Sequence, residues 1–334
     1  MDSITPKDQL LQRNSISAIV ACYKDAQAIP IMAERLVKVF EKCGIDYEII
    51  FVDNGSPDES EEVIRNLSAL NPKVIGITNS RSFEQTSQGS FRSGMEIATK
   101  DACVLLDGDL QDPPELIEGF ISKWREGYDV VYGVRFKREA PLSMQWGSKA
   151  FYRIFDWLST TSMPHDAGDF SLIDKKVVYW ILKCNERDIF IRGIRAYVGF
   201  KQTGIEYHRP ERMFGISSNN FFKNISWAKK GIFSFSRKPL DMLTTFGFAS
   251  VIFTVFLAVF EIILHFISPQ LAPKGITTII LLIMFFGSFN ILAISVVGEY
   301  IAKIFEEVKQ RPSFIRNNLI KNGKIISFPT NQCH

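Results

Sequence analysis

The sequence predicts an α/β fold, a mostly parallel sheet flanked by helices, followed by a C-terminal pair of long apolar helices. Two observations lead to this prediction. Between residues 16 and 135, short apolar runs suited to buried strands alternate with helix-like stretches, as in a parallel sheet covered by helices. Two longer apolar runs, 242–267 and 276–297, exceed an ordinary core helix and match the thickness of a bilayer.

The composition excludes several classes of protein. The 334 residues are 46% hydrophobic and 22% charged, as in a folded protein, and the net charge is only +3. Without a zinc-finger spacing or an aromatic-rich basic run, we expect no nucleic-acid partner. The five cysteines form no CxxC and predict neither a disulfide framework nor a zinc site. Residues 1–14 form a polar tail without an apolar run, so we expect no secretory signal and a cytosolic catalytic part.

The strands of the sheet are expected at short apolar runs. They are Ile16–Cys22, Glu48–Val52, Val74–Thr78, Cys103–Leu106 and Val130–Val134. After the second strand, a helix should begin at Ser56, since Ser56-Pro57-Asp58-Glu59 combines an N-cap, a first-turn Pro and a capping-box Glu. Because such sheets bind ligands at the carboxyl ends of their strands, those ends should hold the site.

Polar residues follow four of the five strands. They are Tyr23, Lys24 and Asp25 after the first strand, 53–56 after the second, Asp107 to Asp109 after the fourth, and Gly133 and Arg135 at the fifth. The Asp-Gly-Asp triplet is open to two interpretations. Asp and Gly favour turns, whereas paired carboxylates bind Mg²⁺ or Mn²⁺ when substrate phosphates supply further oxygens. With no P-loop and no GxGxxG after the first strand, a metal would be the main diphosphate contact.

The two long apolar runs predict a transmembrane hairpin over residues 240–300. Basic residues precede the first run and follow the second, and only Lys274 is charged between them. The positive-inside rule then places both termini in the cytoplasm. Two buried core helices are the alternative. Segment 217–239 has an apolar helical face at 220–233 and basic residues, which favours an interfacial helix over a docking helix. Residues 301–334 should form a cytoplasmic helix and tail.

Several segments in order along the chain carry a resemblance to a known family. They are DGDLQDPPEL, GYDVVYGVR, DAGDFSLID, ERDIFIRG, SFSRKPL and GEYIAKIFEEVKQRP. The chain resembles family 2 glycosyltransferases that make polyprenyl-phosphate sugars, such as bactoprenol glucosyltransferases and dolichol-phosphate mannosyltransferases, over Ile16 to Pro312. The resemblance implies a GT-A fold over residues 15–216, a nucleotide-sugar donor, Mg²⁺ or Mn²⁺ as cofactor, and inversion at the anomeric carbon.

The resemblance also implies roles for individual residues. It assigns the metal to Asp107, Asp109 and Gln111, and the nucleotide to Ala21, Tyr23, Asp25, Asp53 and Gly108. It assigns catalysis to Asp166, Asp169 and Arg135, and the acceptor phosphate to Arg135, Arg187, Arg192 and Arg212. One departure is Asn54, where the family has an Asp, which leaves a base contact through an amide and the choice of uridine or guanosine open.

These inferences predict an inverting transferase that moves a hexose, most consistently glucose from UDP-glucose, onto polyprenyl phosphate at the cytoplasmic membrane face. The lipid-linked sugar would serve cell-surface glycan modification or glycosylation. A phosphate acceptor is mostly ionised at pH 7, so Asp166 and Asp169 need only orient groups, although a base role stays open. The alternatives are a GDP-mannose-dependent mannosyltransferase and a non-catalytic membrane scaffold. A processive synthase is disfavoured because no QxxRW occurs. A homo-oligomer is compatible with the sequence.

Overall fold

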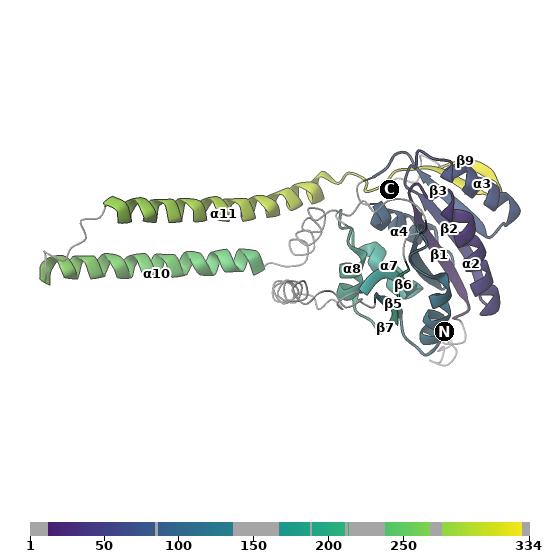
Figure 1. Ribbon diagram of the computed structural model, residues 1–334, viewed down its shortest axis with the longest axis horizontal. Helices are drawn as coiled ribbons and strands as arrows, with labels where there is room; N and C mark the ends of the chain where they lie inside the picture. The colour runs from purple at the N-terminus through teal and green to yellow at the C-terminus, as the bar shows by residue number, and fades with distance from the viewer. Residues whose placement is uncertain are drawn as a thin grey trace, which may run out of the picture. The chain divides into compact units, whose positions relative to one another are not determined.

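The computed structural model describes residues 13–83, 86–135, 167–187, 189–210, 213, 238–267 and 276–328. They fall into a sheet-containing unit (1–144, 162–219 and 310–334) and a helical unit (145–161 and 220–309) (Figure 1). Asp166, Arg212, the tail up to residue 12, the link 268–275 and the amphipathic stretch 220–233 lie outside the described residues.

The first unit is a nine-stranded sheet with helices on both faces. Its strands are β1 (Ser15–Cys22), β2 (Asp46–Asp53), β3 (Val74–Asn79), β4 (Ala102–Asp107), β5 (Val130–Arg135), β6 (Ala167–Asp174), β7 (Gln202–Tyr207), β8 (Arg316–Lys321) and β9 (Lys324–Ser327). Its helices are α2 (Ala28–Lys42), α3 (Ser60–Leu70), α4 (Thr86–Ile97), η1 (Pro114–Leu116), α5 (Ile117–Arg125), α7 (Lys175–Lys183) and α8 (Ile191–Val198).

The strand order is β7-β5-β6-β4-β1-β2-β3-β8-β9. All five predicted strands are present, with ends shifted by at most two residues. The centre β4-β1-β2-β3 is parallel, as the alternating pattern predicts. β6 lies antiparallel between β4 and β5, and β7 pairs in parallel with β5. Because β6 is antiparallel to both neighbours, the sheet is mixed on that side. Neither β6 nor β7 was predicted.

Helices cover both faces because the central strands are apolar on both. Alternate residues of β1, Ile16 and Val20, share a buried core with Leu36 of α2 and Phe120 of α5. The opposite face of β1 meets α4, where a Cβ on Gly94 would lie 2.3 Å from Cγ2 of Ile19. Gly94 therefore allows α4 to pack directly on the sheet, and the unit has three layers.

The predicted helix start at Ser56 is wrong, because α3 begins at Ser60. The Ser56 hydroxyl, which was expected to cap the helix, is bonded to Asp53 instead. The Asp53 carboxylate accepts bonds from this hydroxyl and from the Ser56 backbone N–H (3.2 Å to Oδ2). Asp58 then accepts a bond from the Ser60 hydroxyl at 2.7 Å. Residues 54–59 therefore form a loop at the end of β2 instead of a first helical turn.

The segment after the apolar helices returns to the sheet. β8 pairs antiparallel with β3, and β9 pairs antiparallel with β8. Asn322 (φ 52°) and Gly323 (φ 71°) join them in a two-residue turn with positive φ at both positions, the type that hairpins favour. The C-terminal residues thus complete the sheet, whereas a cytoplasmic helix and tail were predicted for residues 301–334.

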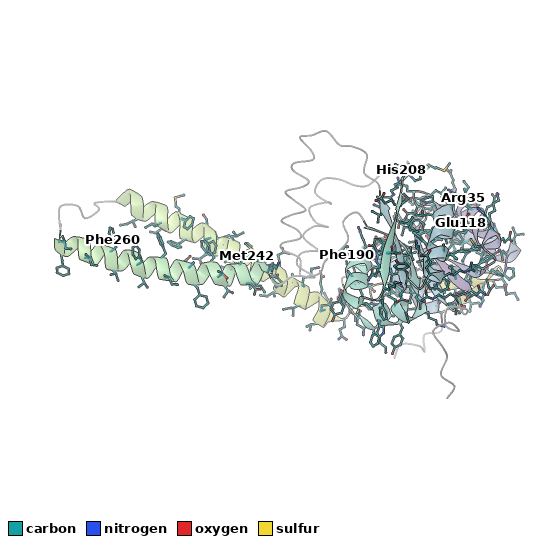
Figure 2. The ribbon with its side chains drawn as sticks, turned by 90° about the horizontal axis from the view of Figure 1, so that it is seen from below. Arg35, Glu118, Phe190, His208, Met242 and Phe260 are labelled. Atoms are coloured by element: carbon teal, nitrogen blue, oxygen red, sulfur yellow. The ribbon has the colours of Figure 1, made fainter. Side chains whose placement is uncertain are left out.

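The second unit contains α10 (Lys238–Ile267) and α11 (Ile276–Lys309), which run side by side in opposite directions (Figure 1). Their contact includes Phe246 and Phe289, whose ring centroids are 4.1 Å apart. Apolar side chains such as Met242 and Phe260 project from α10 and are about half exposed (Figure 2). Among the described residues, one segment, Leu282–Lys309, is long and apolar enough to cross a membrane. The two-span hairpin is therefore not confirmed.

Candidate functional site

The predicted site residues gather at one edge of the sheet. β1, β2 and β4 are parallel, so Asp53 and Asp107 end neighbouring strands at that edge. β5 points the same way, since it and β4 both pair antiparallel with β6. Arg135 therefore ends β5 there, and β6 begins there, with Asp169 as its third residue. Phe190 and His208, labelled in Figure 2, mark the start of α8 and the end of β7.

Gly108 holds the loops after β1 and β4 together. Its N–H donates to the Ala21 carbonyl at 2.8 Å. A Cβ on Gly108 would lie 2.9 Å from Oδ2 of Asp25 and 3.0 Å from the Ala21 oxygen, so a side chain there would force these neighbours to shift. Asp25 in turn accepts the Tyr23 N–H at 2.9 Å, and Tyr23 is exposed. Four of the five residues predicted to bind nucleotide thus adjoin one another beside Asp107.

Asp53, the fifth of that set, is buried at the end of β2. Burial raises its pKa, although the hydrogen bonds from Ser56 oppose that shift. The Ser56 hydroxyl oxygen also accepts the Lys24 N–H at 3.0 Å, which joins the loops after β1 and β2. The nucleotide contact of Asp53 stays a prediction.

Asn54 does not offer the amide that the sequence left open for base contact. Its Nδ2 donates to the Phe83 carbonyl at 3.1 Å, and its Oδ1 accepts bonds from Asn79 Nδ2 at 3.1 Å and the Phe83 N–H at 3.2 Å. The residue is 3% exposed. Its amide therefore holds the loop after β3, and an Asp in this position would lack the donor.

The loop after β4 carries a crowded group of carboxylates. Burial raises the pKa of Asp107 to about 8, helped by repulsion from Asp112, Asp109 and Asp169 and opposed by Arg209. Asp109 accepts the Gln111 N–H at 3.1 Å, so the turn interpretation of the triplet is partly correct. Leu110 between them has φ 61°, a backbone region that costs free energy for a non-glycine residue.

The side-chain oxygens of the loop after β4 are of the kind that binds a hard divalent cation. Carboxylate and amide oxygens are the donors that Mg²⁺ and Mn²⁺ prefer, and a cation would relieve the repulsion among the carboxylates. Within the described part of the chain, no three His, Cys, Asp or Glu residues are arranged to hold a metal by themselves. Asp107, Asp109 and Gln111 fit a metal only if substrate oxygens complete its coordination.

Three residues that were not predicted from the sequence lie in the same cluster: Asp112, Tyr207 and Arg209. Tyr207, the last residue of β7, donates from its hydroxyl to Oδ1 of Asp112 at 2.8 Å. Arg209 places Nη2 4.0 Å from Oδ2 of Asp107 and Nε 3.9 Å from Oδ1 of Asp112. The signal available was His208-Arg209 after a short strand, but Gln202–Tyr207 was not predicted as one.

Three arginines between residues 187 and 195 lie in different settings. Nε of Arg192, on α8, lies 3.1 Å from Oδ1 of Asp169. Arg195, one turn further along α8, is buried, which lowers its pKa to about 10. Arg187 donates from Nη1 to the Arg311 carbonyl at 2.6 Å, which links it to the segment before β8. Its predicted phosphate contact, like the role of Asp169, stays a prediction.

Comparisons with known proteins identify the family. The model of glycosyl transferase family 2 matches residues 17–181. An uncharacterized glycosyltransferase of Bacillus subtilis, YkcC, is 36% identical over 90% of this chain and 92% of its own length. The bactoprenol glucosyl transferase of Shigella phage SfII is 33% identical, covering 90% and 96%. A prophage bactoprenol glucosyl transferase homolog of Escherichia coli is 33% identical, covering 90% and 97%. The chain therefore belongs to glycosyl transferase family 2.

Proposed function

We propose that the protein transfers a hexose, glucose from UDP-glucose, to polyprenyl phosphate with inversion at the anomeric carbon. The observation that carries this proposal is the meeting of carboxylates (Asp107, Asp109, Asp169) with guanidinium groups (Arg135, Arg192) at one sheet edge. A transferase that joins two anionic substrates needs both kinds of group. The names of the bactoprenol glucosyl transferase relatives support the choice of sugar and acceptor.

On the donor side, Asp25 and Asp53 would contact the nucleoside, and Asp107, Asp109 and Gln111 would hold Mg²⁺ or Mn²⁺. When bound, such a metal supplies a Lewis acid for the departing diphosphate. The carboxylates alone would repel that diphosphate. Binding of the donor would therefore depend on the metal that these residues hold. Gln111 is tied by Nε2 to the Pro210 carbonyl at 3.3 Å, which supports a fixed position for its side chain.

On the acceptor side, the guanidinium groups would bind the lipid phosphate, a contact that arginine makes with two parallel hydrogen bonds. The ion pair of Asp169 with Arg192 suggests that Asp169 orients this arginine. A phosphate monoester is mostly ionised at pH 7, so the attacking oxygen needs no strong base. The same residues would suit a sugar hydroxyl less well, since a hydroxyl must lose a proton as it reacts.

The apolar helices suggest how the enzyme would meet a lipid substrate. Leu282–Lys309 is long and apolar enough to cross a bilayer, and large apolar side chains such as Ile252 and Phe248 on α10 are about 70% exposed. Such a surface would be unfavourable in water. We infer that α10 and α11 anchor the chain as two spans and that transfer takes place at the cytoplasmic membrane face, where a polyprenyl phosphate presents its charge.

The test uses the purified full chain in detergent with polyprenyl phosphate, labelled UDP-glucose and Mn²⁺. We expect labelled glucose to move into the lipid extract, and EDTA to stop the transfer. Asp109→Asn should lower the rate by more than about 100-fold, because even partners of metal ligands contribute about 10–100-fold. The matched control is Asp46→Asn at the opposite end of β2, which should keep full activity.

Undiminished transfer by Asp109→Asn, with normal folding, would contradict the metal role of that residue. Parallel reactions with GDP-mannose and other nucleotide sugars identify the donor. If no nucleotide sugar reacts with any polyprenyl phosphate under these conditions, the non-catalytic scaffold becomes the better description.

A further inference from the structure

A buried polar chain joins the carboxylate loop after β4 to the arginine at the end of β5. Arg135 and Tyr207 are register partners at the ends of the parallel strands β5 and β7, and their side chains lie close enough to interact. The Tyr207 hydroxyl donates to Oδ1 of Asp112 at 2.8 Å. Asp112 is 1% exposed and lies three residues after Asp109. The two halves of the site are therefore linked through one phenol oxygen.

The packing of Tyr207 gives that oxygen a defined position. A Cβ on Gly133 would lie only 2.7 Å from Cε1 of Tyr207, so the ring rests directly on the β5 backbone. The Tyr207 ring also makes an edge-to-face contact with the Phe170 ring, with a centroid distance of 5.9 Å and an interplanar angle of 82°. This is a favourable aromatic geometry. With its ring held on two sides, Tyr207 presents its oxygen to Arg135 in one orientation.

Arg135 keeps hydrogen-bonding capacity in this arrangement. Its guanidinium lies beside Gly168, where a Cβ would be 3.5 Å from Nη2, next to Asp169 in the chain. Nε of Arg135 has no hydrogen-bond partner among the residues that the structure describes. A guanidinium has five donors. Tyr207 and Asp112 thus lie on one side of the group, and the buried Nε is a donor that they leave unused.

We propose that Tyr207 and Asp112 are positioning residues that hold Arg135 in the orientation that binds the phosphate of the lipid acceptor. The inference rests on the proposed function and adds to it how acceptor affinity is set. A long arginine side chain loses much rotamer freedom when it binds, and a fixed neighbour reduces that loss in advance. Removing the phenol oxygen should therefore weaken acceptor binding far more than donor binding.

The experiment measures apparent KM for polyprenyl phosphate and for UDP-glucose with the full chain in detergent. Tyr207→Phe removes one oxygen and keeps the ring packing. We expect it to raise the acceptor KM about tenfold, the usual effect of one hydrogen bond to a charged group, and to change the donor KM less than about twofold. Tyr47→Phe, a buried tyrosine near the opposite end of β2, is the matched control and should change neither.

A double-mutant cycle separates positioning from a general structural effect. In an Arg135→Lys background, Tyr207→Phe should have little further effect on the acceptor KM, because the guanidinium that it orients is gone. Asp112→Asn, which keeps an oxygen for the Tyr207 hydroxyl, should raise the acceptor KM less than Asp112→Leu does.

Equal rises in both KM values, a rise for the donor alone, or additive effects in the cycle would overturn the proposal. If wild type transfers nothing to the lipid, the proposed function and this inference both fall; wild-type transfer with an unchanged Tyr207→Phe acceptor KM removes the inference alone.

Discussion

Asn54 uses its primary amide in both directions to hold the loop that follows β3. Its NH₂ group donates to one backbone carbonyl, and its oxygen accepts from a side chain and a backbone N–H. A carboxylate could accept but not donate, and it would bring a negative charge against the Phe83 carbonyl. The departure from the family's usual Asp thus has a local structural reason in this chain.

We predict that Asn54→Asp lowers the free energy of unfolding by about 1–3 kcal/mol, the cost of leaving a buried polar group unsatisfied. Thermal unfolding of the full chain in detergent measures this loss as a lower Tm. Asn71→Asp is the control, because the Asn71 side-chain oxygen accepts the Lys73 N–H at 2.9 Å and an Asp retains that oxygen. Equal Tm values for both variants would contradict the role given to the Asn54 NH₂ group.

At the scale of elements, the β8–β9 hairpin covers the edge of β3 that would otherwise be open to pairing with other chains. Ile320 of β8 is fully buried and packs on Gly76 of β3, where a Cβ would lie 3.1 Å from that side chain. Arg316 adds bonds to Ser93 Oγ at 2.9 Å and Glu96 Oε2 at 2.6 Å on α4. A C-terminal segment therefore belongs to the core of the sheet unit.

Ile320→Ala should destabilise the sheet unit by about 2–5 kcal/mol, the usual cost of truncating a buried aliphatic side chain. The full chain in detergent should show a lower urea midpoint at an unchanged slope. Ile326→Ala on β9 removes a side chain that is 48% exposed and should change stability by less than about 0.5 kcal/mol. If the two variants have the same midpoint, β8 is not part of the cooperative unit.

At the scale of the whole molecule, the helical segment 220–309 is inserted within the chain of the sheet unit, which resumes at residue 310. Both ends of the helix pair are thus connected covalently to the unit that carries the site. If α10 and α11 both span a membrane, as proposed, the two connections must emerge on the same side. This topology requires the link at 268–275 to lie on the opposite side from the sheet.

We predict that a cysteine introduced at Ser268 reacts with a membrane-impermeant maleimide added to intact cells, in a chain whose own cysteines are replaced by serine. A cysteine at Lys324 of β9, an exposed position, should react only after the membrane is opened. Labelling of both positions from outside, or of neither, would contradict the two-span arrangement. Release of the full chain from membranes by alkaline carbonate would contradict membrane insertion altogether.

The parts of the fold that could be predicted from sequence depend on local patterns. Uninterrupted apolar runs identified the central strands, because a parallel strand is buried on both faces. Asp107 and Asp109 could be placed at a strand end for the same reason. The turn residues Asn322 and Gly323 also signalled a hairpin, but the strands beside them are short and partly exposed, so it was missed.

The remaining features arise from contacts between residues far apart in the chain. Tyr207 and Asp112 are separated by 95 residues, and their bond exists only because β7 pairs with β5 and ends at the same edge as β4. The hydrogen bonds of the Asn54 amide and the Ser56 hydroxyl likewise depend on which residues the fold brings next to them. Local composition therefore dictates which segments are buried and which residues cluster at loops. The assembled sheet alone dictates which polar atoms satisfy one another and which are left for substrates, because each buried donor or acceptor must find a partner in space.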